Sequence, residues 1–366
     1  EDRDDEKPNL PNIPEITGLA QEQYEILQVA PDDLDGVCST VQKWLVQRDH
    51  QQDRIIADYS GGTKTMSTGL VVALLEDEQA ELRLVTGARS NLEKIASNDG
   101  YATPASVGRV RLNLRIRDAG LLWSNHAYSE AAKLLQHLPT PRETDLRNDL
   151  QRARDLSLAF AAWDRFDHAQ AYTLLERYRP LLGAKHPEWY NVLKKLTEAG
   201  ADREPLRLFD LYLNARRRAA SERFDDAIAR LYRLLEWSAQ WLLKEVSGLD
   251  TSNLPEDCIP EGLAIPLNRE GRRQAGLFQA WELLSHHGPA PIPTLWEQER
   301  ETLLDLLKLR NHSILAHGFV PLQPSDWKRL EAWTEAKLLP LLLGITRNAP
   351  YRIRQLPEQL PSLFPD

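Results

Sequence analysis

The stretch DRIIADYSGGTKTMS, residues 53–67, decides the fold of the N-terminal third of the chain. Ile55 and Ile56 lie in a short apolar run that is typical of a strand, and residues 59–62 interrupt it. The apolar run at residues 70–75 predicts a buried helix that starts near Thr63. A strand, a glycine turn and a helix start together present backbone N–H groups and the positive end of a helix dipole to an anion.

This glycine turn is therefore a candidate phosphate site. Gly61 and Gly62 let a ligand approach the backbone closely, and Lys64 adds a positive charge beside them. The stretch is not a Walker A loop, because it does not fit the pattern G-x-x-x-x-G-K-[ST]. A plain tight turn in which Thr63 caps the following helix is the alternative interpretation.

Composition limits the class of protein. The 366 residues leave room for two or three domains, and 42% hydrophobic with 27% charged residues is typical of a soluble globular protein. No apolar run approaches the roughly 20 residues of a transmembrane helix. Cys38 and Cys258 lie far apart and predict neither a disulfide framework nor a zinc site, so the cytoplasm is the expected compartment. A net charge of −9 disfavours broad nonspecific binding to nucleic acid but allows a local basic cleft.

The N-terminus has an unusual feature. Met66 is the only methionine, so residue 1 is not a translation start. We expect either a processed chain or a preceding segment, with residues 1–14 as a loop or linker inside a longer protein.

The N-terminal third alternates between strand and helix patterns. The expected parallel sheet has right-handed crossovers and is Rossmann-like, and it lacks an N-terminal strand–helix unit because three strands are few for such a sheet. In open parallel sheets, ligands bind at the carboxyl ends of strands, where the glycine turn lies. The predicted strands are residues 24–30, 54–59 and 81–86, with helices around residues 34–45 and 66–75 between them.

From about residue 115 the pattern is helical. A weak internal similarity, in which an aromatic residue is followed three positions later by alanine, suggests helical hairpins of irregular spacing. Its three members begin at Tyr128, Phe166 and Phe224. The C-terminal half is predicted to be an all-helical bundle. Its expected helices cover residues 203–247, ended by Gly248, then 277–284, 296–316 and 327–343, with a loop at residues 249–273.

A second chemical constellation is RNHSILAH, residues 310–317, at the end of the helix expected over residues 303–316. A seven-residue step returns within roughly 20° of the starting direction, so Arg310 and His317 are predicted to share a helix face. Arginine holds phosphate and stabilises negative charge, histidine moves protons near neutral pH, and RNA supplies its own nucleophile, the 2′-OH. The alternative is a surface arginine and a histidine placed by the dipole of the helix C-terminus.

In context these motifs are more specific. The pattern from Arg310 to His317 resembles the R-x(4–6)-H signature of HEPN ribonucleases, with a gap of six residues. DYSGGTK, residues 58–64, resembles the CRISPR-associated Rossmann fold, or CARF domain. AWDRFDHAQA (residues 162–171) and LYRLLE (residues 231–236) resemble the helical portion of proteins that combine both. The whole chain therefore resembles the CARF–HEPN ribonucleases of type III CRISPR systems.

The resemblance implies a fold that is α/β plus all-α. It implies a CARF ligand-sensing domain at residues 1–115, a helical connecting region at 116–202 and a HEPN ribonuclease domain at 203–366. The family's CARF domains sense cyclic oligoadenylates, and the family's first strand and its loop have no counterpart here. The residues that match the family's ligand loop are Asp58, Ser60, Gly61, Gly62, Thr63 and Lys64.

The resemblance also implies an activity, a metal-independent endonuclease reaction on single-stranded RNA in antiviral defence. The 2′-OH attacks its own phosphate and leaves a 2′,3′-cyclic phosphate and a 5′-OH. His317 would transfer a proton or position the phosphate, Arg310 would stabilise the developing charge, and Asn311 would orient the motif. The family needs no cofactor or metal, its allosteric ligand is the cyclic oligoadenylate, and its sites form where two protomers of a homodimer meet.

Two alternatives stay open at this point. The chain could be a catalytically silent CARF–HEPN sensor, or it could additionally degrade its own cyclic activator. Residues 216–218, Arg-Arg-Arg, are a candidate RNA-contacting patch, with a solvated helix face as the alternative.

Overall fold

The computed structural model describes residues 14, 16–49, 53–87, 89–90, 94–95, 100–182, 186–201, 203–314, 318–346 and 354–361. The chain forms two compact units, and the first comprises Glu1–Asp118 with Leu134–Gln151. The second comprises Ala119–Lys133 with Arg152–Asp366. The bounds of the three expected domains stay a prediction. Within the described residues, no helix combines the length and the apolar character needed to cross a membrane.

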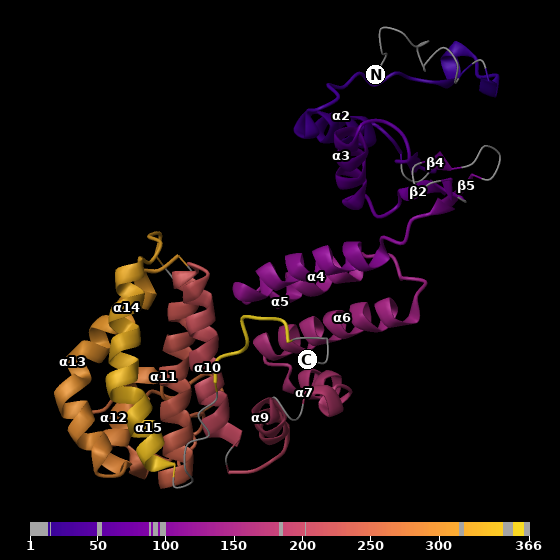
Figure 1. The fold of residues 1–366 in the computed structure, drawn as a ribbon. Coiled ribbons are helices and arrows are strands. Elements are labelled where there is room, and N and C mark those ends of the chain that lie inside the picture. The colour runs from indigo at the N-terminus through magenta and orange to yellow at the C-terminus, as the bar shows by residue number, and fades with distance from the viewer. Residues whose placement is uncertain are drawn as a thin grey trace. The chain divides into compact units, whose positions relative to one another are not determined.

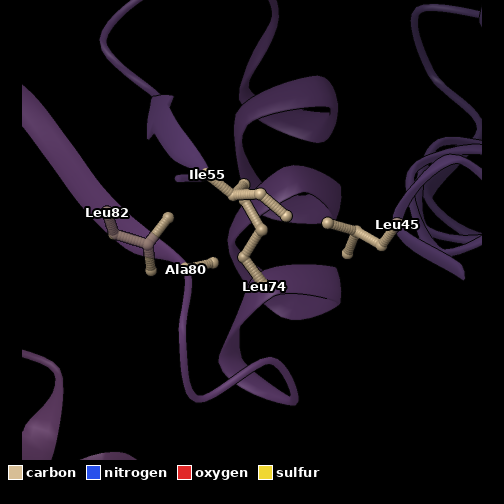
Figure 2. Packing of buried hydrophobic residues seen from close by; sticks show 5 residues of the cluster. All are labelled: Leu45, Ile55, Leu74, Ala80 and Leu82. Atoms are coloured by element: carbon tan, nitrogen blue, oxygen red, sulfur yellow. The ribbon is translucent and has the colours of Figure 1, made fainter. Parts of the chain in front are cut away.

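A single β-α-β unit is the centre of the first unit. Strand β1 (Ile56–Asp58) pairs in parallel with β2 (Glu81–Thr86), and helix α3 (Lys64–Leu75) connects them. Helix α2 (Leu34–Val46) packs along α3. Their shared apolar core consists of Leu45, Ile55, Leu74, Ala80 and Leu82 (Figure 2). Burying one leucine or isoleucine side chain contributes about 1.5–3 kcal/mol, so this core fixes the position of β1 and therefore of the glycine turn that follows it.

Gly69 sets the close approach of α2 and α3. A Cβ atom at Gly69 would lie 2.6 Å from Cγ1 of Val37 and 3.3 Å from the carbonyl oxygen of Leu34. Any side chain at this position would therefore push the two helices apart.

The rest of the sheet differs from the sequence prediction. Residues 24–30, expected to be a strand, have no regular structure after the short 3₁₀ helix η1 (Gln21–Gln23). Strand β5 (Tyr101–Pro104), which was not predicted, pairs antiparallel with β2 and gives the order β1-β2-β5. A second, two-stranded sheet is formed by β3 (Arg89–Ser90) and β4 (Lys94–Ile95). Within the described residues, only β1 and β2 therefore keep the parallel pairing of the predicted Rossmann-like sheet, in an α/β plus all-α fold.

The remainder of the chain is helical, as predicted. Gly248 ends α11 with a left-handed backbone conformation (φ +66°), which glycine adopts without strain. Helices α10 to α14 pack as a bundle in the second unit (Figure 1). The helices are α4 (Gly108–Ser124), α5 (Tyr128–Gln136), α6 (Thr144–Asp164), α7 (His168–Glu176), α8 (Arg179–Leu182), α9 (Pro187–Thr197), α10 (Arg203–Ala220), α11 (Phe224–Ser247), η2 (Glu256–Cys258), α12 (Leu277–His287), α13 (Pro291–His312), α14 (Pro324–Trp333), the π-helical segment Thr334–Leu338 and α15 (Leu339–Ile345).

Three helix connections share one geometry, which accounts for the weak internal similarity of the sequence. The central residues of these turns, His126, Phe166 and Glu222, all have positive φ angles between 55° and 65°. The alanines that follow five residues later, Ala131, Ala171 and Ala227, are fully buried where the helices approach each other. The internal similarity therefore located the three hairpins. Its alignment of the middle hairpin was shifted by two residues, since it matched Ala169 where the structure has Ala171.

Candidate functional site

The glycine turn follows β1 at its carboxyl end and is held by its own polar side chains. Oδ1 of Asp58 accepts a hydrogen bond from the backbone N–H of Ser60 at 2.8 Å. Oγ of Ser60 accepts from the N–H of Val85 on β2 at 2.6 Å, and Oγ of Ser67 donates to the carbonyl of Gly61 at 2.7 Å. Gly62 has φ +82°, a conformation that a side chain would strain. The loop is thus fixed in shape while Gly61 and Gly62 are exposed.

Thr63 and Lys64 begin helix α3 beside this loop. Oγ1 of Thr63 accepts from the N–H of Met66 at 3.2 Å and donates to the carbonyl of Pro31 at 2.7 Å, so Thr63 is the N-cap. The N–H groups of Lys64 and Thr65 have no acceptor within the helix, as in every first turn. Lys64 is exposed. Both predicted features, the capping threonine and an anion-attracting helix start, therefore coexist in one place.

Asp58 has a different place in this arrangement from the other five predicted loop residues. Its carboxylate is already engaged with the Ser60 N–H. A carboxylate also repels a phosphate. Asp58 therefore stabilises the shape of the loop, and the positive character of the loop comes from the first-turn N–H groups of α3 and from Lys64.

The second predicted constellation begins at the end of α13, in the other unit. Helix α13 ends at His312, and Ser313 is extended, with ψ 155°. The prediction that the helix continues to residue 316 is therefore wrong, and so is the argument that places Arg310 and His317 on one helix face. Ser313 is buried and forms a β-bridge with Val320, which takes the chain out of the helical path. His317 itself lies outside the described residues.

Arg310 is half-buried and stacks on an aromatic ring. Its Cζ lies 4.8 Å from the centroid of the Tyr232 ring on α11. Nη1 of Arg310 also lies 3.4 Å from Oδ1 of the neighbouring Asn311, whose side chain is exposed. Among the residues that the structure describes, Arg310 forms no ion pair with a carboxylate. A guanidinium without a carboxylate partner keeps its N–H donors available for a phosphate.

Tyr232 was not identified from the sequence, because a tyrosine at an apolar position of a long helix is typical of ordinary core packing. Burial raises the pKa of the Tyr232 hydroxyl, nearby Arg310 opposes this shift, and Glu236 adds to it. The phenol is therefore neutral at neutral pH.

The arginine run at residues 216–218 is not a free basic patch. Arg217 is only 1% exposed and its Nε lies 2.8 Å from Oδ1 of Asp164, which also pairs with Arg218. Arg216 pairs with Glu331 at 3.1 Å. The predicted RNA-contacting patch is therefore wrong, and so is the alternative of a solvated face for Arg217, because Asp164 draws these side chains into the protein.

The comparisons with known proteins bear on both constellations. Residues 197–337 match the family model described as the Csm6 HEPN domain. The chain also resembles the solved structure of Enterococcus italicus Csm6 bound to cyclic hexa-2′-fluoro-hexa-dAMP. The TM-score is 0.56 at 12% identity, with 88% of this chain and 78% of that chain covered. Residues 197–337 therefore form a Csm6-type HEPN domain, and the chain has a Csm6-like fold. No curated protein sequence matches it.

The two matches have different weight. The HEPN family model spans α10 to α14 and includes Arg310, Asn311 and His317. The structural likeness extends over most of the chain, and at 12% identity it shows the fold. The Csm6-like fold confirms the predicted resemblance, whereas the roles of the individual site residues stay predictions.

Proposed function

We propose that this chain is a cyclic-oligoadenylate-activated, metal-independent endoribonuclease of type III CRISPR defence. The observation that carries the proposal is Arg310, a half-buried arginine held on an aromatic ring without a carboxylate partner in the described residues, inside the segment that matches the Csm6 HEPN family. Such an arginine is suited to a phosphate and not to holding the fold together.

The proposed reaction is a transesterification within the RNA. The 2′-oxygen attacks the adjacent phosphorus, loses its proton, and the bond from phosphorus to the 5′-oxygen breaks. The products are a 2′,3′-cyclic phosphate and a 5′-OH, and the leaving oxygen takes up a proton. Arg310 stabilises the negative charge on the phosphoryl oxygens, His317 transfers a proton, and Asn311 orients the motif. The RNA brings its own nucleophile, so the reaction requires no metal.

The glycine turn is the proposed ligand site. Its exposed backbone, the first-turn N–H groups of α3 and the charge of Lys64 favour the phosphates of a cyclic oligoadenylate. A cyclic oligoadenylate analogue is bound to the Enterococcus italicus protein, which supports this choice of ligand.

Helix α3 offers a way for ligand binding to reach the helical part of the chain. Its N-terminus lies at the loop, and near its C-terminus two arginines of α4 hold backbone carbonyls. Nη2 of Arg111 donates to the carbonyls of Leu74 and Ala80, at 2.8 and 2.9 Å. Nη2 of Arg115 donates to the carbonyl of Glu76 at 2.9 Å. A shift of α3 on ligand binding would therefore be transferred to α4, which continues into the second unit.

A homodimer is proposed from the apolar surface beside the HEPN motif. Ile314, Phe319 and Val320 are 56%, 92% and 66% exposed, although all three side chains are apolar. Clustered apolar residues that flank a candidate active site are typical of an interface. A second copy of the chain would cover this surface and bring its own motif to the same site.

Replacing Phe319 by aspartate is expected to weaken the dimer and ring-stimulated RNA cleavage together. A buried phenylalanine contributes about 1.5–3 kcal/mol, which corresponds to roughly a 10- to 150-fold weaker association. Analytical ultracentrifugation measures the dimer and a labelled RNA measures cleavage. Leu267→Asp, at another exposed apolar residue of the same unit, is the control. A Phe319→Asp variant that stays dimeric and active at low protein concentration contradicts this interface.

The proposed activity is tested with labelled single-stranded RNA and cyclic oligoadenylates of three, four or six units. We expect faster cleavage with one of the rings, without added metal and in the presence of a chelator, and products that end in a 2′,3′-cyclic phosphate. Ring binding without any cleavage would indicate the silent sensor. A labelled ring that stays intact after long incubation with the protein rules out self-degradation of the activator.

A further inference from the structure

The surroundings of Arg310 differ from those of four arginines on α10 and α11. Arg217 and Arg218 pair with Asp164, Arg230 pairs with Asp226, and Arg233 pairs with Glu236. Arg310 instead lies over the ring of Tyr232. Within the described residues, Arg310 therefore has an aromatic ring where these four arginines have a carboxylate.

The nearest acidic side chain along α11 is already engaged. Glu236 lies one helical turn after Tyr232, and its Oε2 accepts from Nη1 of Arg233 at 2.6 Å. Among the described residues, the other contact of the Arg310 guanidinium is the long one to Asn311. Since hydrogen bonds weaken beyond about 3.2 Å, Asn311 does not hold the guanidinium in place. The Tyr232 ring is the group that does.

We propose that Tyr232 is the positioning residue for Arg310, and that the face of its ring holds the guanidinium so that the N–H edge meets the scissile phosphate. This inference rests on the proposed function, because it assigns a second residue to the same site. Tyr232 acts through Arg310 and is not itself placed against the reacting atoms.

An aromatic ring suits this task for two physical reasons. A ring face attracts a guanidinium from above and leaves the in-plane N–H donors free, whereas a carboxylate would occupy those donors and neutralise their charge. For a half-buried pair the attraction amounts to roughly 1–2 kcal/mol, which converts to about a 5- to 30-fold effect and is enough to select one side-chain conformation. Helix α11 is anchored by its contacts with α10, α12, α13 and α14, so it gives the ring a fixed base.

The role belongs to the ring and not to its hydroxyl. Among the described residues, the Tyr232 hydroxyl has no hydrogen-bond partner. Burial keeps the pKa of this phenol above its ordinary value, so no phenolate forms near neutral pH to pair with Arg310. Phenylalanine should therefore replace tyrosine here, and an aliphatic side chain should not.

The test compares Tyr232→Phe with Tyr232→Leu in RNA cleavage stimulated by the cyclic oligoadenylate. Losing a cation–π contact of this strength predicts a fall in kcat of about 5- to 30-fold for Tyr232→Leu, with a smaller change in KM. Tyr232→Phe is expected to keep kcat within about 3-fold of the original protein. Binding of an RNA with 2′-deoxy sugar at the cleavage position, which cannot react, shows whether the substrate still binds.

A control is available at another arginine of α13, the helix that carries Arg310. Arg300 of α13 lies over the ring of Phe278, with 5.2 Å between its Cζ and the ring centroid. Arg300 also pairs with Glu282 and lies over Trp296, so Phe278→Leu removes one ring contact from an arginine that other groups still hold. This variant should leave kcat unchanged, and its effect on thermal stability is the reference for that of Tyr232→Leu. A control that loses as much activity as Tyr232→Leu would show that general destabilisation explains both.

The outcomes separate this inference from the proposed function. If the original protein cuts RNA and Tyr232→Leu cuts equally fast, the positioning role is wrong and the proposed function stands. A loss in Tyr232→Phe as large as that in Tyr232→Leu assigns the effect to the hydroxyl and also overturns the inference. If the original protein cuts no RNA with any of the cyclic oligoadenylates, the proposed function fails, and the role of Tyr232 fails with it.

Discussion

Arg310→Ala is expected to lower RNA cleavage stimulated by the cyclic oligoadenylate by about 100- to 1000-fold. This is the usual effect of removing one group that stabilises charge in a transition state. In the proposed reaction, Arg310 supplies the positive charge that the phosphoryl oxygens need as the 2′-oxygen attacks. Arg310 is half-buried and stacked on Tyr232. Its electrostatic interaction with the phosphate is therefore stronger than that of a mobile surface arginine, because less water screens it. Single-turnover cleavage of a labelled RNA at saturating ring concentration measures the effect directly.

Arg300→Ala is the control for this experiment, because Arg300 also lies on α13 and stacks on an aromatic ring away from the motif. It should cut RNA at the original rate. His317→Ala is expected to lose cleavage as Arg310→Ala does, and both variants should still bind the ring and form dimers. If Arg310→Ala cuts RNA normally, the proposed active site is wrong.

Lys64→Glu is expected to abolish the response to the cyclic ligand. The substitution reverses the charge at the first residue of α3, where the helix dipole and free N–H groups favour an anion. Losing one charge-assisted hydrogen bond costs about 1.5–3 kcal/mol, or roughly a 10- to 150-fold weaker affinity. Repulsion between the new carboxylate and the ligand phosphates adds to this loss.

Two measurements follow the Lys64→Glu effect. Isothermal calorimetry reports affinity, and the shift in unfolding temperature with rings of three, four or six adenylates reports binding, because a ligand that binds only the native state raises its stability. Lys43→Glu, an equal change of charge on the exposed side of α2, is the control. Cleavage without ligand should be the same in all three proteins. Full activation of Lys64→Glu by a ring would show that the ligand binds elsewhere.

Local sequence patterns were sufficient wherever neighbouring residues fix the structure. The turn from β1 to α3 could be predicted because Thr63 caps the helix through its own side chain and Gly62 allows a backbone that other residues avoid. Gly248 ends α11 for the same kind of reason. These features require contacts over only a few residues.

Local patterns failed where contacts with a distant segment determine the secondary structure. Residues 24–30 have the composition of a strand, yet Tyr24, Ile26 and Leu27 remain exposed and no strand pairs with them in the described residues. Strand β5 has four residues and ends in a proline, and it forms because β2 offers it an antiparallel edge. Pairing in a sheet depends on the partner strand, which a local pattern does not contain.

The end of α13 shows the same limit within the candidate active site. A helix pattern over residues 303–316 predicted one face for Arg310 and His317, but Ser313 leaves the helix and pairs with Val320. Spacing in the sequence gives a direction only while the helix continues.

The sequence by itself determined which residues are chemically suited to the two sites: the glycine turn with Lys64, and the motif from Arg310 to His317. Residue type and local spacing carry that information, because capping, glycine conformations and side-chain charge are local properties. Only the tertiary structure decided which charges are free to act. Asp164 engages Arg217 and Arg218 from another helix, while Tyr232 holds Arg310 without neutralising it. Whether a charge is compensated depends on which side chains meet in space, and the chain brings them together from positions far apart in the sequence.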